Sequence, residues 1–312
     1  MVFSLIIVST FFGKVSLDIG KIFDSSSVDF HILTQVRFPR VLLAFLSGGV
    51  LSLSGLLFQN IFRNDLTTPF TLGISGGATL GASSVILAGF GSSGFLGISY
   101  ITIFSFVGAL FTLFLIYFIS KRLGDISTTR LVLVGIALSF LYSSFLLIFY
   151  YLSSFEQSYQ ILRYTMGSLL TVGYRDLFIV FTGAVLLLVV SFYFRRTLKY
   201  ISVSYDFAFL KGIDVEKKIM TLFIVISFSV GLLVSVTGPI GFIGLIVPHM
   251  VKRVLRRSID ELLTLTFVSG GIFLLLCDTV ARVLPSISEI PVGIITSLIG
   301  GSLFIYILLK KR

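Results

Sequence analysis

The sequence predicts an all-α membrane protein: a polytopic bundle of about ten transmembrane helices, organised as a single domain over residues 1–312. Three observations predict it. Of the 312 residues, 56% are hydrophobic and only 12% are charged, which is about half the charged share of a soluble domain. The mean hydropathy is +1.07. The apolar residues also form long unbroken runs, as spanning helices require, and not the alternating pattern of a membrane β-barrel.

Ten apolar stretches are candidate helices, because backbone groups in lipid must be satisfied within their own segment. In chain order they cover residues 1–13, 41–62, 70–89, 95–119, 131–152, 177–194, 219–237, 240–251, 262–284 and 292–309. The first is too short to cross a bilayer untilted, and it lacks the basic segment that begins a signal peptide. The eighth is short and interrupted by Pro248-His249, which predicts a half-helix surrounded by other protein.

The distribution of Lys and Arg predicts how the chain is oriented. With ten spans and both termini in the cytoplasm, the inner loops receive 17 of the 24 basic residues, as the positive-inside rule expects. The remaining outer residues are Lys14, Lys21, Arg37, Arg40, Arg163, Arg175 and Arg282. This bias explains the net charge of +10, so a nucleic acid is not an expected partner.

Small residues recur every four positions in two segments. The two sets are Gly73, Gly77 and Gly81, and Gly293, Ser297 and Gly301. This spacing places each set on one helix face and lets helices approach closely. The first set lies in a Gly-rich segment, but that segment lacks the lysine and the spacing of a phosphate-binding loop. We therefore interpret both sets as packing faces.

The sequence contains no catalytic constellation. It has no Gly-x-Ser-x-Gly elbow and no Walker motif, so the chain is not expected to be an enzyme or to hydrolyse ATP itself. Its one cysteine, Cys277, excludes an internal disulfide, and His31 and His249 lie far apart without a zinc motif. Neither a metal site nor a cofactor is predicted.

Asp278 and Glu289 are the notable acids in or beside apolar stretches, where ionisable groups are rare and often functional. Asp278 and Arg282 are four residues apart and would meet on one helix face, which favours a local ion pair. Glu289 precedes Ile290-Pro291, and a carboxylate before a proline-led helix start suits the positive helix end. A proton or coupling-ion site at these acids is the functional alternative.

Motifs from the region of residue 35 to the C-terminus resemble those of the permease family that imports ferric siderophores, haem and cobalamin. They are Arg37-Phe-Pro-Arg40, Ser54-Gly-Leu-Leu-Phe-Gln59, Pro69-Phe-Thr-Leu-Gly73, Gly238-Pro-Ile-Gly-Phe-Ile-Gly-Leu-Ile-Val-Pro-His249, Asp278-Thr-Val-Ala-Arg282 and Glu289-Ile-Pro-Val-Gly293. Their order and spacing together are specific to that family. One departure is Asn64-Asp65-Leu66, where the family usually has Asn-Pro-Leu.

The resemblance implies the permease subunit of an ABC importer in the bacterial cytoplasmic (inner) membrane. It implies a homodimer of ten-helix subunits surrounded by membrane lipid. It also implies two cytoplasmic ATP-binding subunits and an extracytoplasmic substrate-binding protein. The expected cargo is an iron chelate, a ferric siderophore first, with haem and cobalamin next and an oxyanion as a further alternative.

The resemblance further implies three sets of site residues. The docking set for the binding protein is Arg37, Arg40 and Arg282. The coupling set for the ATPase is Asp206, Ala208 and Gly212. The cytoplasmic gate is Thr128 and Thr129. Each set has a structural alternative. Outer arginines also snorkel to lipid phosphates, inner loops are basic in most membrane proteins, and threonine is an ordinary helix N-cap.

Two other classes of protein remain open. An ion-coupled secondary transporter would use intramembrane acids such as Asp278 and Glu289, and it often has repeated halves; the two halves of this sequence show no convincing repeat. A membrane receptor without transport activity would need a soluble region for its partner, and no loop here is long enough to fold alone.

Overall fold

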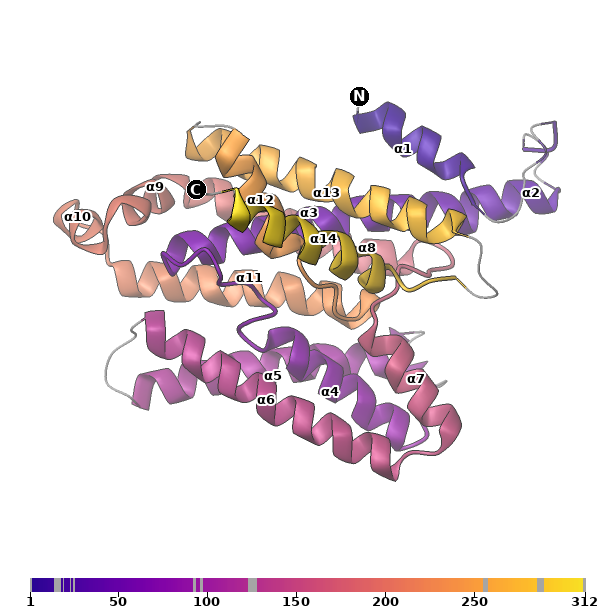
Figure 1. The fold of residues 1–312 in the computed structure, drawn as a ribbon, viewed down its shortest axis with the longest axis horizontal. Coiled ribbons are helices and arrows are strands. Elements are labelled where there is room, and N and C mark those ends of the chain that lie inside the picture. Colours follow the sequence, from indigo (N-terminus) through magenta and orange to yellow (C-terminus); the bar gives the residue numbers. More distant parts are fainter. Residues whose placement is uncertain are drawn as a thin grey trace.

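The structure, a computed structural model, describes residues 2–13, 18, 20–22, 24, 26–91, 94–95, 98–122, 128–254, 258–284 and 289–310. Apart from one hairpin, β1 (Gly94–Phe95) paired antiparallel with β2 (Ile98–Ser99), the elements within these residues are helical (Figure 1). The helices are α1 (Val2–Phe11), α2 (Val28–His31), the π-helix η1 (Ile32–Arg37), α3 (Phe38–Ile61), α4 (Ile74–Leu87), α5 (Tyr100–Arg122), α6 (Thr128–Leu152), α7 (Phe155–Thr165), α8 (Arg175–Tyr193), α9 (Arg195–Val203), α10 (Tyr205–Leu210), α11 (Val215–Thr237), α12 (Ile243–Val254), α13 (Ile259–Val283) and α14 (Val292–Leu309).

Every predicted apolar stretch contains a helix, and the prediction of a helical membrane bundle is confirmed. Among the described residues, six helices are long and apolar enough to cross a membrane. They are Val28–Ile61, which runs without a break through α2, η1 and α3, and Tyr100–Ile119, Arg130–Leu152, Arg175–Tyr193, Val215–Thr237 and Ile259–Val283. Helices α4 and α14 are apolar but shorter. The count of ten spans therefore stays a prediction.

The two stretches predicted to be short form short helices. Helix α1 has 10 residues and α12 has 12. Pro248 lies inside α12, so the proline does not end the helix. Helix α12 packs against α3, α13 and α14, and such neighbours are what make a proline tolerable in a membrane helix.

Helix α3 lies at the centre of the packing, with α13 and α12 along it. The contacts are made at glycine. A Cβ on Gly48 would overlap the carbonyl oxygen of Gly270 in α13, and a Cβ on Gly55 would overlap that of Gly244 in α12. Small residues that allow backbones to touch are the usual basis of helix association in lipid.

The predicted glycine face of α4 is confirmed in part. A Cβ on Gly77 would overlap Thr112 Oγ1, and one on Gly81 would overlap the carbonyl oxygen of Phe104, so α5 packs directly against both. Gly73 has a different role. Its φ of +77° places it at the start of α4 in the left-handed region, which glycine adopts without strain.

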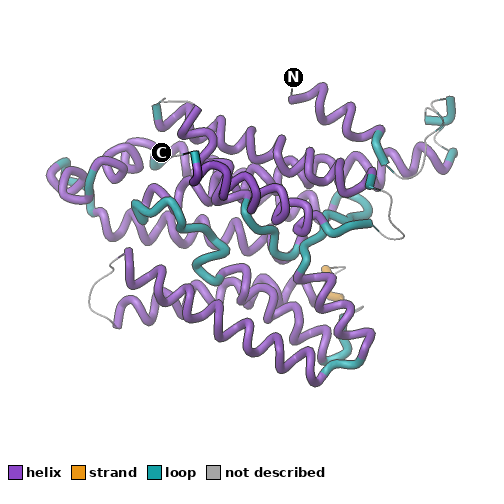
Figure 2. Tube along the Cα trace, viewed as in Figure 1, coloured by secondary structure: helices purple, strands orange, loops and turns teal. Residues whose placement is uncertain are grey.

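Irregular segments cross the middle of the molecule. The segment between α3 and α4 runs toward the layer of α4, α5 and α6, and the segment between α11 and α12 lies among the remaining helices beside α14 (Figures 1 and 2). Non-helical backbone at membrane depth is tolerated where protein surrounds it or where it lines a cavity. These segments therefore indicate where a functional site can lie.

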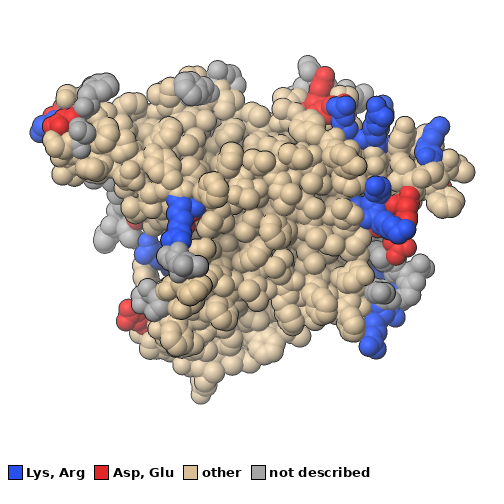
Figure 3. Space-filling model, turned by 180° about the vertical axis from the view of Figure 1, so that it is seen from behind, with Lys and Arg blue, Asp and Glu red and all other residues tan. Residues whose placement is uncertain are grey.

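Charged side chains gather at the two ends of the molecule. Figure 1 shows α9 and α10 at one end and α2 at the other. In Figure 3, Lys and Arg cluster at the end that carries α9 and α10, fewer charges lie toward the opposite end, and the broad surface between them carries none on this face. An uncharged band between charged ends is what a lipid bilayer requires.

Candidate functional site

Buried arginines and carboxylates form a cluster where the start of α3 meets the end of α13. Arg40 is at its centre. Its Nε and Nη2 donate to Asp278 Oδ1 at 3.1 and 2.9 Å, and its Nη1 donates to Glu289 Oε2 at 2.6 Å. Such charge-assisted bonds are the stronger kind of hydrogen bond. One guanidinium thus ties α13, and the segment that leads into α14, to α3.

Two further arginines hold the end of α1. Arg282 Nη1 donates to the carbonyl oxygen of Phe12 at 2.9 Å, and its Nη2 donates to Ser9 Oγ at 3.0 Å. Arg37 Nη1 donates to the carbonyl oxygen of Phe11 at 2.8 Å. The last carbonyls of a helix have no partners within it and favour nearby cations. Arg37 and Arg282 therefore cap α1.

The structure brings together the three arginines of the predicted docking set, and it buries them. Arg37, Arg40 and Arg282 are 6%, 5% and 3% exposed, and Asp278 is fully buried. The Glu289 side chain is 31% exposed and is the most accessible part of the cluster. In the single chain, these guanidiniums are bound by the protein's own carboxylates and carbonyl groups.

The predicted ion pair between Asp278 and Arg282 is confirmed, with Arg282 Nε 3.0 Å from Asp278 Oδ2. The angles are not those of a hydrogen bond, and neither atom has a hydrogen-bonding partner among the described residues, so the attraction is Coulombic. The contact of Arg40 with the same carboxylate was not predicted. It joins residues 238 positions apart, for which local spacing gives no signal. Glu289 lies before α14 as expected, but its partner is Arg40.

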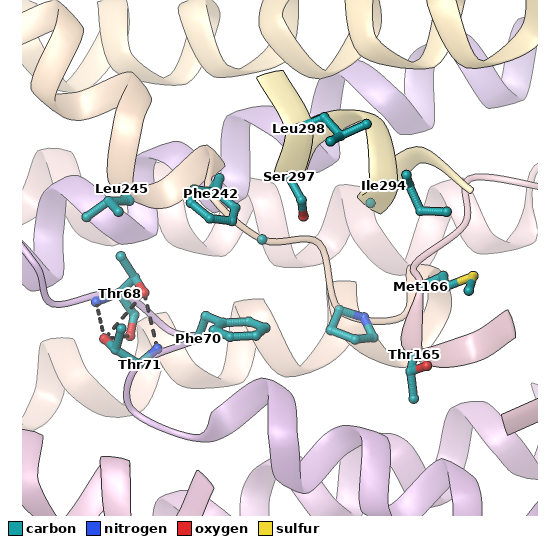
Figure 4. A pocket seen from close by; sticks show the side chains of 13 residues that line it. Thr68, Phe70, Thr71, Thr165, Met166, Phe242, Leu245, Ile294, Ser297 and Leu298 are labelled. Carbon is teal, nitrogen blue, oxygen red and sulfur yellow. Dashed lines mark hydrogen bonds between the residues drawn. The ribbon is translucent and has the colours of Figure 1, made fainter. Parts of the chain in front are cut away.

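A cavity of about 550 Å³ lies where the crossing segments meet α14 (Figure 4). The segments that line it are the one before α4, the end of α7, the one between α11 and α12, and α14. Its labelled lining residues are Thr68, Phe70, Thr71, Thr165, Met166, Phe242, Leu245, Ile294, Ser297 and Leu298. None of the described residues that line it is charged. The walls are therefore apolar groups with a few hydroxyls.

Two local features shape this cavity. Thr68 N donates to Thr71 Oγ1 at 2.9 Å and Thr71 N donates to Thr68 Oγ1 at 3.2 Å (Figure 4). These reciprocal bonds satisfy backbone groups that no helix satisfies. On the opposite wall, a Cβ on Gly293 would overlap the carbonyl oxygen of Met166. Gly293 thus makes the close contact predicted for it, and Ser297, one turn later, faces the cavity.

The predicted coupling residues lie in the segment that joins α9 to α11. Ser204 caps α10, its Oγ accepting a hydrogen bond from Phe207 N at 2.9 Å. Asp206 is exposed in the first turn of α10, and Ala208 is fully buried. Gly212 has a φ of +75°, and no atom of the described residues lies within 4 Å of where a Cβ on it would stand. The left-handed backbone conformation, and not close packing against a described residue, therefore explains why position 212 is a glycine.

Two apolar side chains project from α10, a feature that the sequence did not predict. Phe209 is 74% exposed and Leu210 is 80% exposed. Helix α10 is not one of the membrane spans, and it lies at the end where charged side chains gather (Figure 3). Apolar side chains exposed together in such a place are typical of a surface for another protein.

Thr128 and Thr129, the predicted gate, are the first residues of α6. Their side chains, and all of Ser127 before them, lie outside the part of the chain that the structure describes, so the gate stays a prediction. Within the described residues, no group of three or more His, Cys, Asp or Glu could hold a metal ion. Cys277 is buried in α13.

Comparison with known proteins identifies the family. A sequence model of the FecCD transport family matches residues 1–310. The hemin transport system permease protein HmuU of Yersinia pestis is 32% identical over 302 residues, which cover 96% of this chain and 90% of that protein. The vitamin B12 import system permease protein BtuC of Pectobacterium atrosepticum is 35% identical over 280 residues, covering 89% and 82%. A solved metal-chelate type ABC transporter, in an inward-facing conformation, superposes with a TM-score of 0.84 at 28% identity and covers 100% of this chain and 97% of that one. The chain therefore belongs to the FecCD transport family of ABC importer permeases.

Proposed function

We propose that the chain forms the translocation pathway of an ABC importer for a metal chelate, with an iron chelate as cargo: a ferric siderophore first, haem or cobalamin next. The observation that carries this proposal is the family match over residues 1–310. The relatives named for hemin and vitamin B12 and the solved metal-chelate transporter share one cargo class, a metal held by a large organic ligand. The apolar, hydroxyl-bearing cavity supports it, because sites for such ligands are mostly apolar with a few polar groups.

Uptake by reconstituted vesicles tests this function. The permease and its ATPase are placed in liposomes with labelled ferric siderophore, haem or cobalamin outside together with the binding protein. ATP is expected to drive accumulation of one of these chelates. Accumulation driven by an ion gradient without ATP would support the ion-coupled alternative instead. No observation favours that alternative, since Asp278 and Glu289 are both bound to Arg40.

A matched pair of variants tests the cavity. Ser297→Phe places a ring into the cavity, whereas Ser302→Phe places the same ring at an exposed position of α14 that does not line it. We expect Ser297→Phe to lower the uptake rate at least several-fold and Ser302→Phe to leave it near the wild-type rate. Equal uptake by both variants would show that cargo does not pass this cavity.

We propose that the extracytoplasmic binding protein docks at the end that carries Arg37, Arg40 and Arg282. The gathering of guanidiniums there supports this. Because the three side chains are buried and internally bonded, we expect them to act mainly by shaping and charging that end. Affinity of the binding protein for Arg37→Gln should fall a few-fold, in line with about 0–1 kcal/mol for one charged contact.

The exposed Arg163, assigned to the same side by the predicted orientation, supplies the control for that experiment as Arg163→Gln. The difference between the two variants should shrink with added salt, because the Debye length falls to about 3 Å at 1 M. If Arg37→Gln binds as tightly as the control at every ionic strength, the arginines serve only the fold and the docking proposal fails.

We propose that the ATP-binding subunits dock on α10 and the turn after it, where Asp206, Ala208 and Gly212 lie. The exposed Phe209 and Leu210 support this. Gly212→Asn adds a side chain where the described chain leaves open space, and asparagine tolerates the left-handed conformation better than most residues. We therefore expect the variant to fold and to lose ATPase co-purification.

Gly89 provides a matched control for the coupling experiment. Its φ is +81°, and a Cβ added to it would likewise meet no atom of the described residues within 4 Å, but it lies after α4 and away from α10. In Gly89→Asn the new residue must also adopt a left-handed conformation, and we expect the ATPase still to co-purify with this variant. If Gly212→Asn also retains the ATPase in full, the ATPase does not approach this glycine.

We propose that two copies of the chain form a homodimer that closes the pathway, with Thr128 and Thr129 as its cytoplasmic gate. Their position at the start of α6 supports this, because a helix end near a dimer axis can narrow a pore with its side chains. Thr128→Cys and Thr129→Cys should form cross-links between the two copies in at least one nucleotide state. Absence of cross-linking in every state would place the gate elsewhere.

A further inference from the structure

A second pocket, of about 590 Å³, lies beside α9, at the end of the molecule where Lys and Arg gather. Four elements form it: the end of α3 with the loop that follows, α9, the end of α12 and the start of α13. Charged side chains reach it from three of these elements, namely Arg63, Asp65, Lys199 and Lys252. Leu56 and Leu262 contribute apolar walls. The pocket is separate from the cavity of Figure 4, with which it shares no lining residue.

Positive charge exceeds negative charge in this pocket. Lys252 Nζ donates to Asp65 Oδ1 at 3.1 Å, so the one acid among the described lining residues is engaged by one lysine. Arg63 donates to the carbonyl oxygen of Val203 at 3.2 Å, and this bond leaves its charge unneutralised. Lys199 is exposed on α9. Arg63 and Lys199 therefore present two cations that no described lining carboxylate balances.

The pocket also holds buried amides. Gln59 is 3% exposed, its Nε2 donating to the carbonyl oxygen of Gly244 at 3.3 Å and its Oε1 accepting from Lys252 at 3.0 Å. Asn60 Oδ1 is buried and has no hydrogen-bond partner among the described residues. Buried polar atoms are nearly always satisfied. With less than 1 Å² of accessible surface, the Asn60 oxygen lies behind the pocket wall and does not face an occupant.

The position of the pocket at the ends of two long apolar helices indicates which kind of molecule it binds. Helices α3 and α13 are long and apolar enough to cross a membrane, and α3 ends and α13 begins at this pocket. Span ends lie at the level of lipid headgroups. Helix α9 buries Leu198 and Ile201 and exposes its basic residues, as a helix lying along a membrane surface does. Basic pockets between membrane helices on the positively charged side bind anionic headgroups.

We propose that this pocket binds the phosphate of an anionic phospholipid from the leaflet that is cytoplasmic in the predicted orientation. Arg63 and Lys199 hold the phosphate, since guanidinium and ammonium groups both bind it. The apolar walls at Leu56 and Leu262 receive the start of the acyl chains. The lipid thereby fastens α9 to α3 and α13. This inference depends on the membrane orientation and not on the proposed cargo.

Lipid binding by the purified full-length protein tests the proposal. The protein in detergent micelles is titrated with phosphatidylglycerol, with phosphatidylcholine and with inorganic phosphate, and bound lipid is counted by native mass spectrometry. The variants are Lys199→Gln, Arg63→Gln and both together. The control is Lys211→Gln, which removes a charge at the same end of the molecule without touching the pocket.

Wild type and Lys211→Gln are expected to bind phosphatidylglycerol saturably and in preference to phosphatidylcholine. Loss of one cation should weaken binding about fivefold and loss of both roughly 30-fold. Equal binding by the double variant and the control, or equal binding of both lipids, overturns the proposal. Saturable binding of inorganic phosphate that depends on Lys199 and Arg63, without lipid preference, assigns the pocket to a soluble phosphate compound and overturns the lipid.

The fold of each variant is checked by thermal unfolding. Lys199→Gln changes an exposed side chain and carries the test alone if Arg63→Gln does not fold. No step of this experiment measures uptake, so its failure leaves the proposed transport function untouched. In the same way, failure of chelate uptake leaves the lipid site standing.

Discussion

Removing the Asp278 carboxylate should destabilise the protein more than any other single change in the arginine cluster. Asp278 is fully buried, accepts two hydrogen bonds from Arg40 and lies 3.0 Å from Arg282. In Asp278→Ala, the described residues that still contact the Arg282 guanidinium are all uncharged, and the one carboxylate that still contacts Arg40 is Glu289. Breaking a buried ion pair from one side costs about 3–5 kcal/mol. That is a large part of the roughly 5–15 kcal/mol by which proteins are stable.

The free energy of unfolding, measured by reversible denaturant titration in detergent micelles, checks this prediction. Glu289→Gln is the matched comparison. Its side chain is 31% exposed, and glutamine keeps an oxygen for Arg40, so we expect a loss of about 1 kcal/mol or less. A double-mutant cycle of Arg40→Ala and Asp278→Ala should give a coupling of about 0.5–3 kcal/mol. If Asp278→Ala costs no more than Glu289→Gln, the cluster does not hold the fold together.

Two further predictions concern packing and pH. Gly55→Ala should abolish the contact of α3 with α12, because its Cβ would overlap the carbonyl oxygen of Gly244. In the control, Gly301→Ala, the added Cβ meets only the ring of Phe242, at 3.8 Å. The melting temperature should fall sharply in Gly55→Ala and hardly in Gly301→Ala, and equal melting temperatures would contradict the packing argument. The hydrogen bond from Lys217 lowers the pKa of Asp214, the N-cap of α11. The charged cap is therefore present above that pKa and lost as pH falls through it, so amide protection in the first turn of α11 should persist through the usual Asp range near about pH 4 and fall only below it. A loss of protection that begins well above about pH 4 would contradict this.

The sequence predicts the helices well because lipid leaves a long apolar segment few alternatives. The stretch expected over 131–152 is α6, Thr128–Leu152, and that expected over 292–309 is α14, Val292–Leu309. The short helices α7 and α9 were missed because they are too polar and too short to stand out. Helix α7 did carry a local signal, the capping box of Ser154 and Gln157, which is recognisable from spacing alone.

For the candidate sites too, contacts between residues close in sequence could be predicted and contacts between distant segments could not. Asp278 and Arg282 are a helix turn apart, so their pairing could be predicted from spacing. The bonds of Arg40 to Asp278 and Glu289 join distant parts of the chain and leave no periodic pattern. The cavity is assembled from several separate segments, and only the resemblance to a family, not local chemistry, indicated that these segments matter.

The capping of α1 by Arg282 has a consequence for biosynthesis. The hydroxyls of Ser9 and Thr279 lie 2.7 Å apart although 270 positions separate them in the chain. Helix α1 leaves the ribosome long before α13, which carries two of the residues that fasten it, Thr279 and Arg282. A helix of 10 residues is marginal by itself. Arg37 can cap it early, but the contacts with Thr279 and Arg282 wait for the synthesis of every helix up to α13. In a nascent chain that stops short of Thr279, Arg37 is the one of these capping residues present, and the full set of contacts forms only when the two distant segments have met.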